Sequence, residues 1–549
     1  MNKVLKINAD DNAIVALTDL NAGDVVNVAG EDITIQEKIA AKHKFAETDL
    51  QVGDEVKMYG VLVGKSTQPI KEGGLLSTAN IAHAASTFTL GDRKLDWIIP
   101  DVSKWQTKTF NGYHRADGSV GTANHWLVIP MVFCENRNVG VLQEALVNQL
   151  GYGKNNTYRN QANAIIDLYK RGSSVEQILN AEVKVDTAKV QSERLFPNVD
   201  GIKFLTHEGG CGGTRQDAQA LCGLLAGYIT HPNVAGATIL SLGCQNAQVS
   251  ILKEEIYKRT PDFNKPLFVL DQQETGSEAD LLSEAIKQTF AGLVIANENV
   301  RKPAPLSKLC IGLECGGSDG FSGISANPAI GYTSDLLVAL GGSVILAEFP
   351  ELCGVEQNLS DRCVSVSDAQ RFNSLMTTYN EKAEAVGSGF YMNPSPGNIK
   401  DGLITDAIKS AGAAKKGGTS PVTAVLDYPE KVTKPGLNLL CTPGNDVEST
   451  TAVVAAAANI VLFTTGLGTP TGNPIAPVVK IATNTKLFNR MHDIMDVNMG
   501  TIIDGEETIP QAGERMLDYV IKVASGEIEV ASVKHGQDDF IPWKRGISL

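Results

Sequence analysis

The strongest constraint on the fold is a regular alternation of short apolar runs with longer segments of helical periodicity. Each run ends in a polar or glycine-rich turn, which is typical of a buried parallel strand. The helical segments include Arg215–Ile229, Glu278–Phe290 and Pro328–Leu340. We therefore expect residues 110–549 to form an α/β region with Rossmann-like parallel sheets in two lobes. The predicted strands are GIKFLTH, GATILSLGC, KPLFVLDQQ, KLCIGLECGG, SVILAEF, GLNLLCTPGND and NIVLFTTGLG.

The chain has 549 residues, which is long enough for several domains. Residues 1–95 predict a small β-rich domain, because short alternating runs such as AIVAL and DVVNVAG are separated by turn residues. A linker is expected at 96–109, where the sequence becomes polar and irregular. The remainder divides into an α/β catalytic domain at 110–390 and a C-terminal α/β domain at 391–549. The boundary is placed there because Asn393–Ser420 is rich in turn formers.

The charge balance restricts the partners of the protein. There are 48 basic and 62 acidic residues, a net charge of −14, which argues against nucleic acid or an anionic membrane as the main partner. No apolar run has the length of a membrane span, and the first residues lack the apolar core of a signal peptide. A cytoplasmic protein is expected. Its nine cysteines, an odd number, indicate reduced thiols or metal ligands and not a disulfide framework.

Four cysteines share one position, at or just after the end of a predicted strand: Cys134, Cys211, Cys244 and Cys315. The carboxyl ends of parallel strands line the ligand crevice of an α/β fold, so these thiols are expected to converge on one site. Thiolates suit iron, zinc or an iron–sulfur cluster. The alternative is that each cysteine is a small buried apolar residue. Taken together, their shared position favours metal binding.

Acid and base candidates follow the same strands. Glu314, Asp319 and Glu348 lie in or just after strand-end turns, where carboxylates ligate a divalent metal or transfer protons. Helix capping is the alternative, and it is preferred for Glu351 and Glu356. His207, just before EGGCGG, is the histidine best placed to act as a ligand or base.

Cations and glycine turns give candidates for binding an anionic substrate. Such turns hold carboxylates or phosphates on backbone N–H groups. No Walker A sequence and no strand-linked dinucleotide fingerprint is present, which argues against an NTPase or a nicotinamide dehydrogenase. The candidates are Arg215, Lys409, Lys480 and the Asn445–Asp446 pair of PGND.

The motifs, in this order along the chain, resemble the altronate/galactarate dehydratase family of sugar-acid lyases. They are DGSVGTAN, HEGGCGGT, HPNV, LSLGCQN, ECGGSDGFSGISANPAIG, AEFPELCGVEQ, NPSPGN, CTPGNDVEST and LFTTGLGTPTG. The N-terminal segment AKHKFAETDLQVGDEVKMYGVLVG is similar to the small β-clip (SAF) domain that precedes the catalytic part in that family.

The resemblance implies a hydro-lyase that dehydrates a sugar acid, D-altronate first, to 2-dehydro-3-deoxy-D-gluconate. It also implies iron, either as mononuclear Fe(II) or, from the cysteines, as an iron–sulfur cluster. D-galactarate and other aldonates or aldarates are alternative substrates, and a sulfolactate-type sulfo-lyase is an alternative reaction. A sugar-acid sensor without catalysis is the non-enzymatic alternative. The expected partner is a small sugar acid, and a homo-oligomer is expected.

The chain departs from the family pattern at several positions. Ser77 and Ala79 occupy the places of two histidines in a His-x-His-Asn segment of the N-terminal domain. Ala123 and Leu467 stand where arginines are expected, and Gln245 stands where a glutamate is expected. Because arginine binds carboxylates in a bidentate manner, substrate recognition is expected to differ from the family pattern.

Overall fold

Three small antiparallel sheets build the N-terminal unit. The computed structural model describes residues 3–85, 88–153, 157–183 and 193–549. One sheet has the order β1 (Val4–Leu5), β2 (Ala13–Ala16), β5 (Lys44–Ala46) and β8 (Leu75–Leu76). The others are β3 (Val25–Val28) with β4 (Glu31–Thr34), and β6 (Glu55–Met58), β7 (Val61–Ser66) and β9 (Ile81–Ala82). The prediction of a β-rich start is confirmed.

The second unit contains a four-stranded parallel sheet and a small antiparallel one. The parallel order is β13 (Gly201–Phe204), β12 (His125–Pro130), β14 (Val234–Ser241) and β15 (Leu267–Asp271). Helices α1 (Asn136–Leu146) and α7 (Glu278–Ala296) cover one face, and α4 (Arg215–Thr230) and α5 (Val249–Arg259) cover the other. The antiparallel sheet is β11 (Val120–Gly121), β10 (Thr109–His114) and β16 (Arg301–Pro305).

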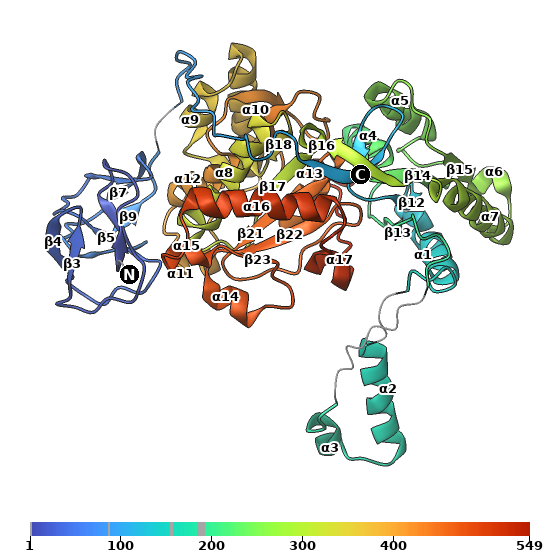
Figure 1. Ribbon diagram of the computed structural model, residues 1–549, viewed down its shortest axis with the longest axis horizontal. Helices are drawn as coiled ribbons and strands as arrows, with labels where there is room; N and C mark the ends of the chain where they lie inside the picture. The colour runs from blue at the N-terminus through green and yellow to red at the C-terminus, as the bar shows by residue number, and fades with distance from the viewer. Residues whose placement is uncertain (1–2, 86–87, 154–156, 184–192) are drawn as a thin grey trace.

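A seven-stranded parallel sheet forms the centre of the third unit. Helices α8 (Ala326–Ala339) and α16 (Ile509–Ala524) pack on one face, while α13 (Asp446–Ala455) packs on the other and contacts α4 of the second unit. Figure 1 shows this sheet between the N-terminal and second units. Its order is β19 (Val422–Leu426), β20 (Gly436–Leu440), β18 (Ser343–Leu346), β17 (Cys310–Cys315), β21 (Ile460–Thr465), β22 (Val478–Ala482) and β23 (Val497–Asn498).

The remaining helices connect these sheets and include the short elements that carry the site. They are α2 (Thr157–Lys170), α3 (Val175–Leu179), α6 (Gln272–Thr275), α9 (Glu356–Asp361), α10 (Val366–Glu384), α11 (Pro396–Lys400), α12 (Asp406–Ala414), α14 (Thr485–Arg490), α15 (Gly500–Ile503) and α17 (Ala531–His535), with 3-10 turns η1 (Phe133–Glu135), η2 (Leu306–Lys308), η3 (Ser322–Ile324), η4 (Phe349–Leu352), η5 (Phe390–Met392) and η6 (Lys415–Gly417). No helix in the described part of the chain is long and apolar enough to cross a membrane.

Every run predicted as a strand of the α/β region forms a parallel strand, but the predicted division at residue 390 is corrected by the sheet order. Strands β18 and β20, on either side of that residue, are hydrogen-bonded neighbours. The change of sheet occurs instead between β16 and β17. Local apolar patterns show where strands are, whereas sheet membership depends on contacts between distant segments.

The N-terminal unit docks onto the third unit through polar contacts. Lys42 Nζ lies 3.0 Å from Asp319 Oδ2 and 3.1 Å from Asp401 Oδ1. The buried Lys44 Nζ donates to the carbonyl oxygen of Gly402 at 2.6 Å. The Thr405 hydroxyl, just before α12, donates to Val63 O at 2.8 Å. These bonds place β5 and β7 against the start of α12.

Candidate active site

Acidic, basic and thiol groups meet at the carboxyl ends of the central strands of the seven-stranded sheet. Glu314 and Cys315 end β17, and Glu348 follows β18. Lys416 Nζ, in η6, lies 2.8 Å from Cys315 Sγ and 2.7 Å from Glu348 Oε2. We call this set the strand-end cluster; its members are Glu314, Cys315, Glu348, Glu351, Lys409, Lys416 and Asp446.

Glu348 is held in an unusual conformation at the centre of the cluster. Its backbone has φ 63° and ψ 59°, the left-handed region that costs a residue with a Cβ about 1–2 kcal/mol. The Cys315 N–H donates to Glu348 Oε2 at 3.1 Å, while Oε1 is buried without a hydrogen-bond partner among the described residues. Burial raises the pKa of Glu348 to about 7, against the opposing effect of Lys416. The carboxyl group therefore titrates near neutral pH.

Glu314 is the complementary acid. Its Oε1 accepts from the Ser449 hydroxyl at 2.8 Å, and its Oε2 has no partner in the described part of the chain. Burial, followed by the nearby Glu348 charge, raises the pKa of Glu314 well above its usual value. Glu314 and Glu348 are thus two neighbouring buried carboxyl groups whose pKa values are both raised. Buried carboxyl groups with perturbed pKa values are typical of acid–base sites.

Glu351 and Lys409 close the other side of the cluster as an ion pair 2.7 Å long. The Cys315 thiol donates to Glu351 Oε2 at 3.0 Å. Burial acts to raise the pKa of Glu351, but Lys409 and Lys416 lower it below the usual value. The interpretation of Glu351 as a structural residue is therefore corrected, because its side chain lies inside the cluster.

Lys416 was not predicted, since the sequence KKGG was interpreted only as a turn. Its ammonium is fully buried. Burial alone would lower its pKa, but the neighbouring thiol and carboxylates raise that pKa well above the usual value. The sequence signal that could have pointed to Lys416 is a lysine next to glycines in a short segment between a helix and a strand.

Of the four cysteines predicted to bind a metal, three lie in the second unit and one lies in the third. Cys134, Cys211 and Cys244 are exposed in the loops after β12, β13 and β14, which are adjacent strands. Backbone bonds join these loops, from Phe133 N to Gly209 O at 3.1 Å and from Ala247 N to Gly210 O at 3.0 Å. Cys315 is buried in the other sheet, where it contacts Lys416 and Glu351. Sequence could place each cysteine at a strand end but could not assign the strands to sheets.

His207 holds the turn that carries Cys211 through hydrogen bonds to the backbone. Its Nε2–H donates to the carbonyl oxygen of Pro130 at 2.7 Å, and its Nδ1 accepts the Gly209 N–H at 3.1 Å. Burial lowers its pKa, which keeps the ring neutral. Both ring nitrogens are engaged by backbone, so the expected role as ligand or base is corrected to one of positioning the turn that carries Cys211.

Asp319 is also a docking residue and not a free acid or base. Its Oδ1 accepts from Phe321 N at 3.2 Å, Ser322 Oγ at 3.0 Å and Thr483 Oγ1 at 3.0 Å. Its Oδ2 accepts from Asn484 Nδ2 at 3.2 Å and pairs with Lys42. These bonds occupy both oxygens of a buried carboxylate, so its predicted catalytic role is corrected.

The predicted anion-binding residues have different surroundings. Arg215 is exposed on the first turn of α4, and Lys480 lies within β22, where its buried ammonium donates to Gln537. Asn445 caps α13 by accepting from Val447 N and Glu448 N. Asp446 and Lys409 reach the strand-end cluster, and a Cβ at Gly316 would lie 2.2 Å from Asp446 Oδ2. The structure thus brings only these two of the five predicted substrate-binding residues into that cluster.

A cavity of about 590 Å³ lies beside the cysteine loops. It is bordered by His207, Cys211 and Thr214 on one side and by Trp543 and Lys544 on the other. The final residue, Leu549, donates its N–H to Gly212 O at 2.6 Å. The C-terminal segment therefore forms one wall of this cavity.

Family models match the three units in order. The altronate/galactarate dehydratase SAF domain matches residues 2–84, the D-galactarate dehydratase/altronate hydrolase second domain matches 112–297, and the D-galactarate/altronate dehydratase C-terminal domain matches 306–548. The chain is 32% identical to an altronate dehydratase of Escherichia coli strain K12 over 99% of both chains. The chain belongs to the altronate/galactarate dehydratase family. It is also 32% identical to an altronate dehydratase of Bacillus subtilis strain 168 over 100% of both chains.

A second branch of the altronate/galactarate dehydratase family is represented by a galactarate dehydratase (L-threo-forming) of Escherichia coli strain K12. It is 29% identical over 97% of this chain and 94% of its own. The gap between the second and third family models, residues 297 to 306, contains β16, after which the sheet changes. The resemblance identified from the motifs is confirmed by these matches.

The iron that the family resemblance implies does not fit the strand-end cluster. Cys315, Glu348 and Glu351 place ligand atoms within 4.8 Å of one another. However, the Lys416 ammonium already donates to two of these groups, and Lys409 pairs with the third. The three exposed cysteines of the second unit offer free thiols from three joined loops, and thiolates are ligands of iron, but their ligand atoms do not all lie within 4.8 Å of one another.

Proposed function

We propose that this chain is a hydro-lyase that removes water from a sugar acid, with D-altronate as the first substrate and 2-dehydro-3-deoxy-D-gluconate as the product. The 32% identity to two altronate dehydratases, over 99% and 100% of this chain, supports a sugar acid as the substrate. The observation that carries the chemistry is the pairing of Glu348 and Glu314, two buried carboxyl groups with raised pKa values in one cluster.

In this proposal Glu348 is the general base. It takes the proton from C2, beside the substrate carboxylate, and its pKa of about 7 suits that transfer near neutral pH. Lys416 holds the Glu348 carboxylate in place. Together with Lys409, it stabilises the negative charge that develops on the enediolate. The exposed residues Gly444 and Asn445 border the cluster.

Glu314 is the general acid of the second half of the reaction. Its raised pKa keeps a proton available for the 3-hydroxyl group. The C3–O bond breaks, the hydroxyl leaves as water, and the resulting enol gains a proton at C3 and loses its O–H proton to give the 2-keto group. The proton taken at C2 and the proton given at C3 balance. After turnover, Glu348 loses its proton to solvent and Glu314 regains one.

We place the iron of this proposal at Cys134, Cys211 and Cys244, and leave Cys315 outside it. Iron bound there would supply Lewis-acid chemistry. An iron–sulfur cluster, which spreads several irons between its thiolates, suits three separate loops better than a single ion does. Labile sulfide in anaerobically purified protein would support the cluster, and its absence after reconstitution would support mononuclear Fe(II). A cytoplasmic location and a homo-oligomeric state remain predictions.

Turnover of anaerobically prepared, iron-supplied protein tests the function. We expect formation of a 2-keto-3-deoxy acid from D-altronate, with slower or no reaction on D-galactarate and other aldonates. Faster turnover of galactarate would change the substrate but keep the reaction. Sulfite release from sulfolactate would replace the dehydratase by a sulfo-lyase. Sugar-acid binding without turnover, in iron-loaded folded protein, would favour a sensor and contradict the proposal.

A further inference from the structure

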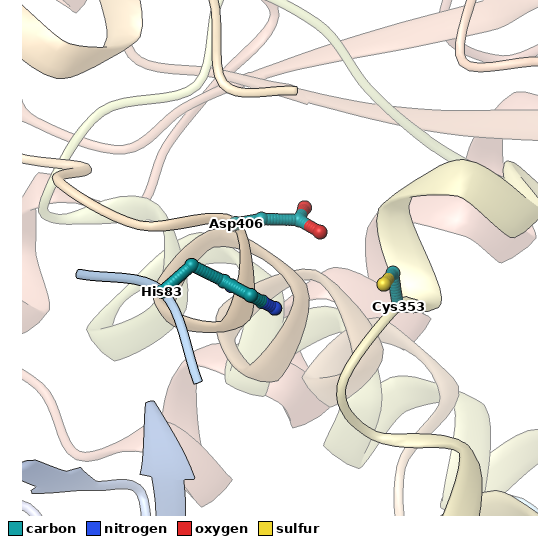
Figure 2. Close-up of side chains that lie close together, drawn as sticks. All are labelled: His83, Cys353 and Asp406. Carbon is teal, nitrogen blue, oxygen red and sulfur yellow. The ribbon is translucent and has the colours of Figure 1, made fainter. Parts of the chain in front are cut away.

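A second group of metal-type ligands lies away from the cysteine loops, where the N-terminal unit meets the third unit. It consists of His83, Cys353 and Asp406, whose ligand atoms all lie within 4.8 Å of one another. Figure 2 shows the imidazole, the sulfur and the carboxylate pointing toward one another from three separate pieces of chain. None of these residues was singled out by the sequence motifs.

Each ligand comes from a different element. His83 directly follows β9 of the N-terminal unit. Cys353 ends η4, two residues after Glu351, and Asp406 is the first residue of α12, one turn before Lys409. The group is therefore assembled only when the N-terminal unit is docked.

One buried polar atom of this group lacks the hydrogen-bond partner that such atoms normally have. Asp406 is only 1% exposed, and its Oδ2 has no hydrogen-bond partner among the described residues. No hydrogen bond joins either His83 ring nitrogen to the described part of the chain. A buried carboxyl group with one unpartnered oxygen, facing an imidazole and a thiol, indicates a missing cation.

The backbone around the group is shaped for close approach. Gly354, next to Cys353, has φ +96°, and a Cβ there would lie 3.2 Å from both Ala407 Cβ and Ala85 Cβ. Only glycine adopts this φ easily, and it lets the three segments meet. Gly354 therefore allows the segments that carry Cys353 and Asp406 to lie close together.

We propose that His83, Cys353 and Asp406 bind a divalent transition-metal ion of the zinc class, which fastens the N-terminal unit to the third unit. One nitrogen, one sulfur and one oxygen ligand suit Zn²⁺ or Fe²⁺, whereas Mg²⁺ and Ca²⁺ prefer oxygen alone. Ligand atoms about 2.0–2.3 Å from zinc lie closer together than 4.8 Å, so small side-chain rotations complete the site. A fourth position is left for water.

The site also borders the proposed catalytic groups. Cys353 and Glu351 lie on or beside η4, while Asp406 and Lys409 share α12. A metal ion that fixes the start of α12 would hold Lys409 in register with Glu351. The site is nevertheless independent of the proposed function, because none of its ligands belongs to the strand-end cluster or to the cysteine loops.

Cobalt titration of the full-length, chelator-treated protein tests the site. We expect the parent to bind one more Co²⁺ per chain than His83→Asn, with loss of part of the thiolate-to-cobalt absorption in Cys353→Ser. Asp406→Asn should weaken this ion by about tenfold or more. The control is His492→Asn, which changes an exposed histidine outside the group and should bind cobalt like the parent.

The stability of the protein gives a readout that does not depend on activity. Zn²⁺ should raise the thermal unfolding midpoint of the parent and of His492→Asn but not of His83→Asn. Since His83 is exposed as a residue, its replacement leaves the fold intact, and far-UV circular dichroism verifies this. Unchanged cobalt stoichiometry and absorption in both His83→Asn and Cys353→Ser would overturn the proposal, whether or not the enzyme dehydrates a sugar acid.

Discussion

Lys416 is the residue on which the charge balance of the strand-end cluster depends. Its side chain is 1% exposed, and its ammonium bonds to Cys315 Sγ and Glu348 Oε2. Removing one partner of a buried ion pair leaves an uncompensated charge, which costs about 3–5 kcal/mol. Lys416 therefore contributes to folding as well as to the proposed chemistry. A substitution of its partner Glu348 separates these two roles better than a substitution of Lys416 itself.

Glu348→Gln is expected to lower kcat by about a hundredfold or more, because an amide cannot accept the C2 proton. The amide keeps the size of the side chain and can still accept from Lys416, so the far-UV spectrum should not change. The measurement is the rate of 2-keto-3-deoxy acid formation. Glu507→Gln, which changes a carboxylate paired with Arg515, is the control and should retain full activity. Full activity in Glu348→Gln would contradict its role as base.

The pH profile should show the ionisation of Glu348. Its pKa of about 7 means that the basic form is lost as pH falls, so kcat/KM should rise with pH through about 7 and then level. At pH 6 the ionised fraction is about one tenth, and activity should fall in proportion. Initial rates between pH 5.5 and 8.5 measure this limb. A flat profile across that range would exclude a base with this pKa.

At the scale of elements, the order of strands decides which loops meet. The apolar runs correctly predicted that Cys134, Cys211 and Cys244 lie at strand ends. The strand order then places these three cysteines in neighbouring loops. The apolar runs could not separate Cys315, because local pattern does not tell which strands share a sheet. Lys416 escaped prediction for the related reason that its burial arises from the packing of η6 against β18.

Gly210→Ala should disturb the loop that carries Cys211. Gly210 has φ +99°, and a Cβ there would lie 2.2 Å from the backbone oxygen of Met131. The control is Gly118→Ala, where φ is +77° but no atom lies within 4 Å. Strain alone costs about 1–2 kcal/mol, so urea unfolding should show this for Gly118→Ala and a larger loss for Gly210→Ala. Equal losses would show that Met131 does not restrict the loop.

At the scale of the whole molecule, the N-terminal unit is bound by apolar contacts and by charges at a protein–protein-like interface within one chain. Lys42 pairs with Asp319 and Asp401, and Lys44 is fully buried with its pKa lowered to about 7, chiefly by burial. Asp319 is inaccessible to water, and the docked Lys42 is the cation that pairs with it. The position of this unit is therefore linked to the order of the loops after β17.

Lys42→Gln should loosen the docked unit. Leaving buried Asp319 without its cation is expected to cost about 1–3 kcal/mol and to speed amide hydrogen exchange at residues 398–405. Lys6→Gln is the matched control, because Lys6 pairs with Glu47 inside the N-terminal unit and has a similar exposure. Faster exchange at 398–405 in the control, or none in Lys42→Gln, would contradict the interface.

The bond from Lys44 to Gly402 also has a consequence in time. Its two residues are 358 positions apart in the sequence. At a synthesis rate of about 5–20 residues per second, the ribosome makes the N-terminal unit roughly 20–70 s before its docking surface. During that interval the nascent unit stands alone, with Lys42 and Lys44 in water. Docking is therefore a late event in biogenesis, and a pause between the codons for β9 and α12 would lengthen the period in which that surface is open to chaperones.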